Sequence, residues 1–252
     1  MREHWDEVEQ VVLTHATQTN EPGRCATLAP VLASIGEPLA LIEVGMSAGL
    51  CLAPDRYGYR YHRHDQVTEL PVPGHGAPIF DCLVSGAEGR PLARPEVVWR
   101  AGIDLNPLDP GDADDAAWLR ALVWPDQPDR ERRLARALAV TAETEVHRVS
   151  GDAVAELPAL IDRAPAGATV VVMHSAVLAY FEPRQCAEFA ALMARLQRER
   201  GVRWVSNEGT GVLPDVVAGL GDRPMRPDKF LLALDGEPVA ATGSHGQRLH
   251  WW

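Results

Sequence analysis

Short apolar runs alternate with longer amphipathic segments through most of the chain. The apolar runs predict strands over residues 39–44, 96–103, 145–149, 169–173 and 202–206, and the segments between the later runs predict helices over about 112–123, 129–142, 154–162 and 183–200. Strands that alternate with helices of this length are typical of a parallel sheet with helices on both of its faces. The pattern therefore predicts an α/β fold.

Two regions depart from that alternation. After the first strand, Tyr57, Tyr59 and Tyr61 alternate with polar residues, the period of two expected of a half-buried strand, and a further strand is predicted over 79–84. We interpret residues 51–95 as an antiparallel insertion. Near the C-terminus, three short apolar runs separated by glycine-containing turns predict antiparallel strands over 230–234, 239–242 and 247–251.

The chain has 252 residues, of which 46% are hydrophobic and 23% charged. This composition is that of an ordinary globular protein and excludes the disordered and fibrous classes. We expect one domain over 1–252, with residues 1–37 as a helical lead-in. The net charge of −11 argues against nucleic-acid partners.

Four cysteines lie far apart in the sequence, at Cys25, Cys51, Cys82 and Cys186. They form neither a C-x-x-C pair nor a Cys/His cluster, so no metal site and no disulfide scaffold is predicted, and a cytoplasmic location is expected. No signal peptide precedes the first strand, and no run approaches the ~18 apolar residues of a membrane span. The sequence carries no signal for an oligomeric state.

Polar residues follow the predicted parallel strands, where ligands bind in open α/β sheets. The five strand ends carry, in order, the stretch Glu43-x-Gly45-x-Ser47-x-Gly49, then Asp104, Asp152, His174-Ser175 and Asn207-Glu208. A glycine-rich first turn followed by an acid at the end of the next strand suits a nucleoside, because the acid accepts hydrogen bonds from the ribose hydroxyls. The spacing differs from that of dinucleotide sites, since the acid lies about 55 residues beyond the glycines rather than ~20. A nucleoside ligand without a pyrophosphate, such as S-adenosylmethionine, is therefore expected.

Several stretches resemble a bacterial family known as domain of unknown function two-three-three-two. They are Gln18-Thr19-Asn20-Glu21-x-Gly23-Arg24, Glu43-Val44-Gly45-x-Ser47-Ala48-Gly49-Leu50, Asp55-Arg56-Tyr57-x-Tyr59-x-Tyr61, Gly102-Ile103-Asp104-Leu105-Asn106-Pro107, Val123-Trp124-Pro125 and His174-Ser175-Ala176-Val177. The resemblance implies a divergent class I methyltransferase with a Rossmann-like sheet and S-adenosylmethionine as cofactor. It also implies that Glu43 to Gly49 form the glycine-rich motif, that Asp104 binds the ribose and that Asp152 approaches the adenine.

Other residues near the strand ends complete the predicted site. His174 is a candidate acid or base, because an imidazole titrates near neutral pH, and Tyr180 shares its rim. Asn20 and Arg24 are candidates for the cofactor's methionine carboxylate, and Ser175 is a further candidate for cofactor binding. For each of these residues, a purely structural role is the alternative. The same holds for Asp104 and Asp152, because an aspartate at the end of a strand can cap the helix that follows.

These features predict an S-adenosylmethionine-dependent methyltransferase acting on a small organic molecule. The sequence does not distinguish a carboxylate, hydroxyl or amine acceptor. One alternative is an α/β-hydrolase-like serine esterase, because Gly45-x-Ser47-x-Gly49 also fits the nucleophile elbow, with His245 or His250 and Asp222 or Asp235 as partners. A non-catalytic protein that binds a nucleoside cofactor is the other alternative.

Overall fold

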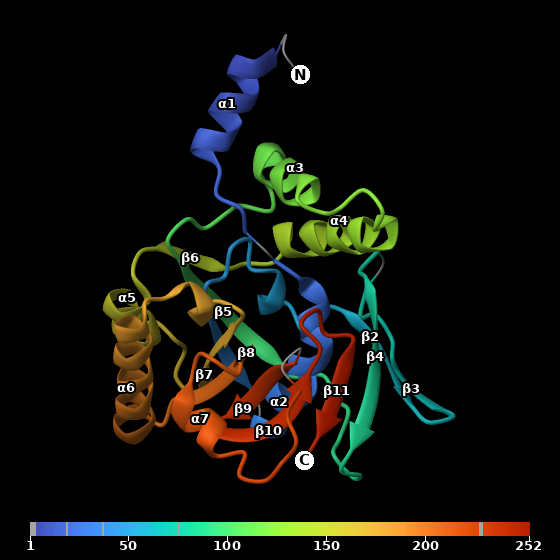
Figure 1. Ribbon diagram of the computed structural model, residues 1–252, viewed down its shortest axis with the longest axis vertical. Coiled ribbons are helices and arrows are strands. Elements are labelled where there is room, and N and C mark those ends of the chain that lie inside the picture. The colour runs from blue at the N-terminus through green and yellow to red at the C-terminus, as the bar shows by residue number, and fades with distance from the viewer. Residues whose placement is uncertain (1–3, 19, 37, 75, 227–228) are drawn as a thin grey trace.

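The computed structural model describes residues 4–18, 20–36, 38–74, 76–226 and 229–252, except for the side chain of Glu7. Eleven strands in these ranges form one sheet, in the order β3-β2-β4-β11-β10-β9-β8-β7-β1-β5-β6 (Figure 1). The strands are β1 (Leu39–Val44), β2 (Gly58–Arg63), β3 (Gln66–Leu70), β4 (Ile79–Gly86), β5 (Val97–Asp104), β6 (His147–Ser150), β7 (Thr169–Ser175), β8 (Arg203–Gly209), β9 (Phe230–Leu234), β10 (Glu237–Thr242) and β11 (Arg248–Trp251).

One half of the sheet is parallel and matches the predicted strand series. It runs β6-β5-β1-β7-β8, and every neighbouring pair in it is parallel. The chain therefore builds outward from β1 in both directions, and the point where the order reverses lies between β1 and β7. The carboxyl ends of these strands meet at one edge, which we call the carboxyl edge.

Helices cover both faces of this parallel half. The helices are α1 (Trp5–Thr14), α2 (Cys25–Ile35), α3 (Ala113–Ala121), α4 (Pro128–Ala142), α5 (Ala153–Ile161), α6 (Pro183–Arg200) and α7 (Pro214–Ala218), with short 3₁₀ turns η2 (Pro22–Arg24), η3 (Leu50–Leu52) and η4 (Leu178–Tyr180). Buried residues of α5, α6 and α7 pack on one face together with Ile42 and Val44 of β1. On the other face, α2 and α4 pack with Leu39 and Leu41. We call these the α6 face and the α2 face.

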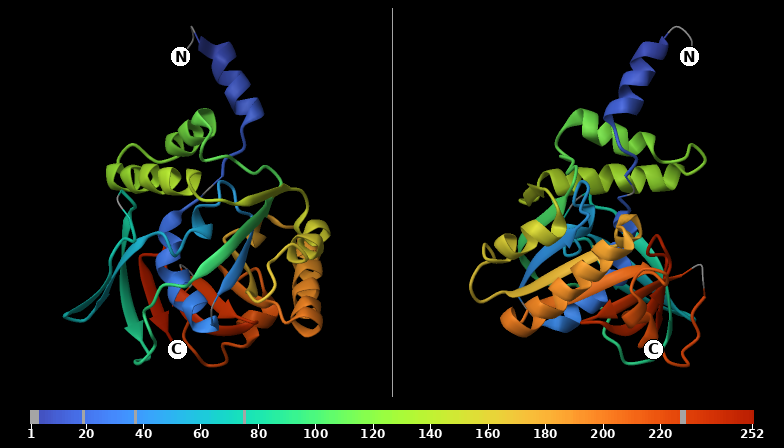
Figure 2. Two further views of the ribbon diagram at one scale, coloured as in Figure 1. Left: turned by 180° about the vertical axis from the view of Figure 1, so that it is seen from behind. Right: turned by 60° about the vertical axis from the view of Figure 1, so that its left-hand side comes forward.

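The other half of the sheet curls around α2. One apolar core joins α2 to residues of β1, β2, β4, β10 and β11, and Figure 2 shows α2 inside the curve of the sheet. Every residue of α2 from Cys25 to Leu32 is buried. A helix that is apolar on all sides requires such an enclosed position. By contrast, α1 projects from the body of the molecule (Figure 1).

The predicted antiparallel insertion over 51–95 needs correction. Strands β2 and β3 form an antiparallel hairpin, but β2 pairs with β4 in parallel, and β4 pairs in parallel with the C-terminal β11. The insertion is therefore an integral part of the sheet. The antiparallel C-terminal strands are confirmed, since β8, β9, β10 and β11 pair in succession as antiparallel neighbours. The part of the chain that the structure describes contains no helix with both the length and the apolar composition of a membrane span.

Candidate functional site

The turns after β1, β5 and β6 are joined by hydrogen bonds at the carboxyl edge. The backbone N–H of Ser47 donates to Oδ2 of Asp104 at 2.8 Å, and the N–H of Asn106 donates to Oδ1 at 2.9 Å. The N–H of Gly151, which precedes Asp152, donates to the backbone oxygen of Asp104 at 3.0 Å. Asp104 therefore connects the three turns that the sequence assigned to a nucleoside.

The glycine turn packs tightly against the loop that follows β7. Gly45 has a φ of 72°, and a Cβ placed on it would lie 2.2 Å from a methyl carbon of Val177. A glycine is therefore required here both by the backbone conformation and by the close approach. Val177 therefore packs directly on the glycine turn at the point where the strand order reverses.

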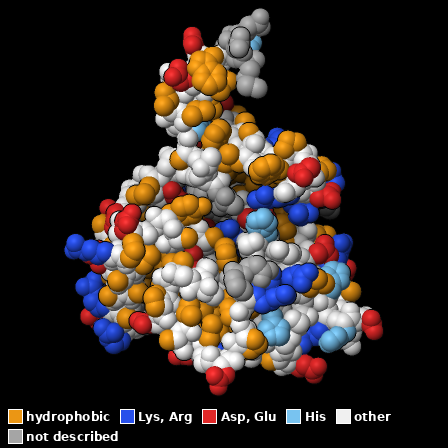
Figure 3. All heavy atoms as spheres, viewed as in Figure 1, with side chains coloured by type: hydrophobic (Ala, Val, Ile, Leu, Met, Phe, Trp, Pro, Cys, Tyr) orange, Lys and Arg blue, Asp and Glu red, His pale blue; other side chains and the backbone are white. Residues whose placement is uncertain are grey.

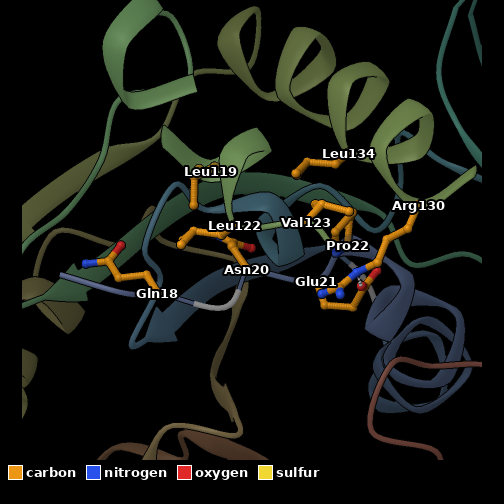
Figure 4. A pocket seen from close by; sticks show the side chains of 9 residues that line it. All are labelled: Gln18, Asn20, Glu21, Pro22, Leu119, Leu122, Val123, Arg130 and Leu134. Atoms are coloured by element: carbon orange, nitrogen blue, oxygen red, sulfur yellow. Dashed lines mark hydrogen bonds and ion pairs between the residues drawn. The ribbon is translucent and has the colours of Figure 1, made fainter. Parts of the chain in front are cut away.

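A segment from the N-terminal lead-in crosses the glycine turn. Ser47 Oγ donates to the side-chain oxygen of Gln18 at 2.6 Å, and the Gln18 amide donates to the backbone oxygen of Asn106 at 3.0 Å. The side chain of Asn20 donates to the backbone oxygen of Met46 at 2.8 Å. We call residues 18–21 the strap, although Thr19 lies outside the described residues. Beside the strap, the cavity shown in Figure 4 has a volume of about 40 Å³, which is close to that of one water molecule.

Asp152 caps helix α5, which is the structural role that the sequence offered as an alternative to ligand binding. Its Oδ1 accepts from the N–H groups of Val154 and Ala155, at 2.9 and 3.0 Å. No described donor bonds its other oxygen, and the residue is exposed. The aspartate therefore combines a structural role with a carboxylate oxygen that faces the solvent beside Asp104.

Glu43 and Arg24 lie buried beneath the glycine turn, on the α2 face. Glu43 is 5% exposed, and its Oε2 has no hydrogen-bond partner among the described residues. Burial raises the pKa of this carboxyl well above its ordinary value, the Cys51 thiol adds to the increase, and the charge of Arg24 opposes it. Arg24 donates from Nη1 to the backbone oxygen of Ser175 and from Nε to that of Ser244, both at 2.9 Å.

His174 lies on the opposite, α6 face of the sheet and is 1% exposed. Its Nδ1 lies 2.7 Å from Oε1 of Glu208, and its Nε2 accepts from the indole of Trp204 at 2.9 Å. Because Nε2 is the acceptor, Nδ1 carries the hydrogen and donates to Glu208. Both ring nitrogens are therefore engaged inside the core, away from the strap and Asp104.

The two remaining candidates, Ser175 and Tyr180, lie in different places. Ser175 lies on the α2 face, where its Oγ accepts from the Asn207 amide at 2.9 Å, and Asn207 in turn accepts from the hydroxyl of Thr242 at 2.7 Å. Tyr180, in η4, is 81% exposed. The structure thus gathers Asn20, Gly45, Ser47, Gly49 and Asp104 at one edge, with Asp152 beside them and Glu43, Arg24 and Ser175 below. It does not bring His174 or Tyr180 to the same place.

Ser47 has the positive φ of a strained turn, at 50°, as a nucleophile elbow requires. Its hydroxyl donates to Gln18, however, and no histidine among the described residues hydrogen-bonds it. In the same part of the chain, no group of three or more His, Cys, Asp or Glu is arranged to hold a metal ion.

Three polar groups near this edge were not assigned to the cofactor site from the sequence, and His245 was named there only as a possible esterase partner of Ser47. Gln18 and Glu21 belong to the stretch that carried the family resemblance, so a signal for them was present. His245 lies in the turn between β10 and β11, beyond the parallel strands, and its position next to Glu21 depends on the fold alone.

The fold and the site thus define an α/β protein with polar groups gathered at the ends of its parallel strands. The chain belongs to the family described as "Uncharacterized protein conserved in bacteria (DUF2332)", whose model matches residues 1–251. Comparison with curated proteins and with solved structures gives no match.

Proposed function

We propose that this protein is an S-adenosylmethionine-dependent methyltransferase whose cofactor binds at the carboxyl edge of β1, β5 and β6. The observation that carries the proposal is the position of Asp104, at the end of the strand next to β1 and bonded to the glycine turn. The parallel order β6-β5-β1-β7-β8 supports the proposal, because doubly wound nucleotide-binding sheets share this strand order and bind their ligands at this edge.

The polar groups at the edge suit a nucleoside. A carboxylate has about four lone-pair positions, and the two described bonds to the Asp104 side chain leave capacity on both oxygens for ribose hydroxyls. Asp152 offers a further exposed oxygen to an adenine amino group. Arg24 carries a buried positive charge whose described hydrogen bonds go to backbone carbonyls, and this charge suits the carboxylate of the cofactor's methionine moiety.

The backbone after β1 favours a ligand without a pyrophosphate. Dinucleotide sites place the pyrophosphate at the N-terminus of the helix that follows the glycine turn. Here the turn leads into the three-residue η3, and no α-helix occurs between β1 and β5 among the described residues. The partial positive charge that such a helix would provide is therefore lacking.

Cofactor binding at the glycine turn requires the strap to move, because the side chains of Gln18 and Asn20 bond across that turn. At Gln18 and Asn20 the strap is held to the glycine turn and to Asn106 by three hydrogen bonds between uncharged groups, whereas its last residue, Glu21, is buried and pairs with Arg130. Bonds between uncharged groups contribute only about 1 kcal/mol each, because water or a ligand can replace them. When bound, the cofactor supplies an activated methyl group, so the protein's own contribution is to align the two molecules and exclude water.

Calorimetric titration with S-adenosylhomocysteine and with NAD tests the proposal. We expect heat and a raised melting temperature with S-adenosylhomocysteine alone, because a ligand bound only by the native state stabilises that state. Binding of NAD but not of S-adenosylhomocysteine, or of neither, would contradict the cofactor assignment.

Two aspartates provide a matched pair of variants. Asp112 caps α3 with the same geometry with which Asp152 caps α5, since each carboxylate accepts from the second and third N–H groups at 2.9 and 3.0 Å. Serine preserves a helix cap and removes the charge. Asp152→Ser is therefore expected to weaken S-adenosylhomocysteine binding several-fold, whereas Asp112→Ser leaves the affinity unchanged. Equal affinities in the two variants would remove Asp152 from the site.

Ser47 distinguishes the methyltransferase from the esterase. In our proposal its hydroxyl only shapes the turn, so Ser47→Ala is expected to retain S-adenosylhomocysteine binding. Intact-mass spectrometry after treatment with a fluorophosphonate probe gives the complementary result. Covalent labelling of the parent that is lost in Ser47→Ala would establish a serine hydrolase instead.

A further inference from the structure

An open groove of about 470 Å³ lies beneath the first turns of α4, and Glu21, the last residue of the strap, lines both this groove and the small cavity beside the strap. We call it the α4 groove. It is formed by residues far apart in the sequence: Glu21, Phe80 of β4, Arg130 and Arg133 of α4, and His245 between β10 and β11. Figure 3 shows basic and histidine side chains gathered around a hollow in this part of the surface.

The turn that carries His245 is fixed by close packing. A Cβ on Gly23 would lie 2.6 Å from the backbone oxygen of His245, and a Cβ on Gly246 would lie 1.9 Å from the backbone oxygen of Gly23. Arg24 joins this turn to the end of β7, because it donates to the backbone oxygens of both Ser244 and Ser175. Arg24 and the packed turn around His245 therefore connect the groove to the carboxyl edge.

Most charges that line the groove are already paired. Glu21 pairs with Arg130 at 2.8 Å, Asp81 with Arg60 at 4.0 Å, and Asp129 with Arg132. Arg133 is half-buried and has no hydrogen-bond or ion-pair partner in the described part of the chain. Asp126 has no described partner either, but it is exposed, where water and salt screen its charge. A positive charge at Arg133 thus remains available to a ligand.

The imidazole of His245 is also available to a ligand. Neither of its ring nitrogens has a described hydrogen-bond partner, so the ring is free to bond a polar group in the groove. Phe80 lies under the groove, but it is only 3% exposed and its ring packs against Tyr57 and Tyr59 in the core. A cation beside a free imidazole matches a small molecule that carries a carboxylate.

We propose that the α4 groove binds a small organic carboxylate, with Arg133 holding the carboxylate and the His245 ring hydrogen-bonded to the ligand. This assignment names the substrate class that the sequence left open. Its interpretation as the methyl acceptor rests on the proposed function, whereas carboxylate binding itself does not.

The ionisation of His245 provides a readout in the parent protein. Partial desolvation of the ring lowers the pKa of His245 below its ordinary value, and Arg130 and Arg24 add to this effect, whereas the Glu21 carboxylate opposes it. Asp81, Asp129 and Arg133 also line the groove. A carboxylate bound beside the ring stabilises the imidazolium, so the pKa of His245 is expected to rise when the groove is filled.

Benzoate is the carboxylate probe, and benzyl alcohol is its neutral counterpart. NMR titrations are expected to show saturable benzoate binding, a raised pKa at His245 and no comparable effect of benzyl alcohol. Arg133→Ala should weaken benzoate binding about tenfold. Arg136→Ala is the matched control, because Arg136 lies on the same helix, is exposed and does not line the groove.

Three results would overturn the proposal: no saturable benzoate binding by the parent, equal benzoate affinities in the two arginine variants, or an unchanged His245 pKa at saturation. S-adenosylhomocysteine titration of Arg133→Ala separates this proposal from the cofactor assignment. Unchanged cofactor affinity with weakened benzoate binding supports a separate carboxylate subsite. Benzoate binding without any S-adenosylhomocysteine binding would keep the subsite and refute the methyltransferase.

Discussion

His174 and His245 both lie near the carboxyl edge, but their surroundings are opposite. His174 is buried on the α6 face, and both of its ring nitrogens are bonded, to Glu208 and Trp204. His245 is exposed at the α4 groove, and neither of its ring nitrogens has a described partner. The histidine that the sequence selected is therefore part of the core, whereas the one available for a ligand lies outside the parallel strands.

The difference shows that a position at a strand end does not determine which face a side chain occupies. Successive side chains along a strand point to opposite faces. On β7, His174 shares the α6 face with Val172, and its neighbour Ser175 shares the α2 face with Met173. A shift of one residue would have exchanged their environments.

The largest expected effect is on stability. His174→Ala removes a buried side chain and leaves Glu208 and Trp204 without their partner, so it should lower the free energy of unfolding by about 3 kcal/mol. His245→Ala should change it by less than about 0.5 kcal/mol. Urea unfolding of both variants measures the contrast, and similar losses would show that the two environments are not distinct.

A smaller effect is expected where the His245 turn packs against η2. Gly23→Ala places a methyl group 2.6 Å from a backbone oxygen, and overpacking of this kind costs about 2 kcal/mol. Gly211→Ala is the control, because a Cβ at Gly211 meets no atom within 4 Å. If the two alanine variants unfold at the same urea concentration, the turn is not fixed as we describe.

The smallest effect is a pH dependence at Glu43. Its pKa is raised in the folded state, so the unfolded state releases its proton first as the pH increases above about 4.5. The contribution of Glu43 to stability is therefore complete below that pH and decreases as the pH rises through the folded-state pKa. Glu43→Gln cannot lose a proton, so its melting temperature should match that of the parent near about pH 4.5 and exceed it increasingly at higher pH. A difference that does not change with pH would mean that Glu43 is ionised in the fold.

Much of the fold could be predicted because its strands are short apolar runs bounded by turns. β1, β9 and α6 begin and end at the predicted residues. By contrast, β3 was missed because its residues are almost all exposed and carry no apolar period. The parallel pairing of β4 with β11 was also missed, since it joins residues more than about 160 positions apart and no local pattern encodes it.

The sequence also predicted part of the candidate site, namely the residues that follow the parallel strands. Asp104 and the glycine turn follow parallel strands, so topology alone brings them together. The strap was present in the sequence as a motif, but its path across Ser47 depends on side-chain hydrogen bonds. The α4 groove could not be predicted, because it joins α4, β4 and a C-terminal turn that only the curled sheet makes neighbours.

Hydrogen exchange with and without S-adenosylhomocysteine tests the central claim most directly, because it reports where a ligand protects the backbone. The account predicts slower exchange in the turns after β1, β5 and β6, at residues 45–49, 104–106 and 151–155, and altered exchange in the described part of the strap. The core around His174 should remain unchanged. Protection confined to other segments, or saturating ligand without any protection in these three turns, would contradict a cofactor site at the carboxyl edge.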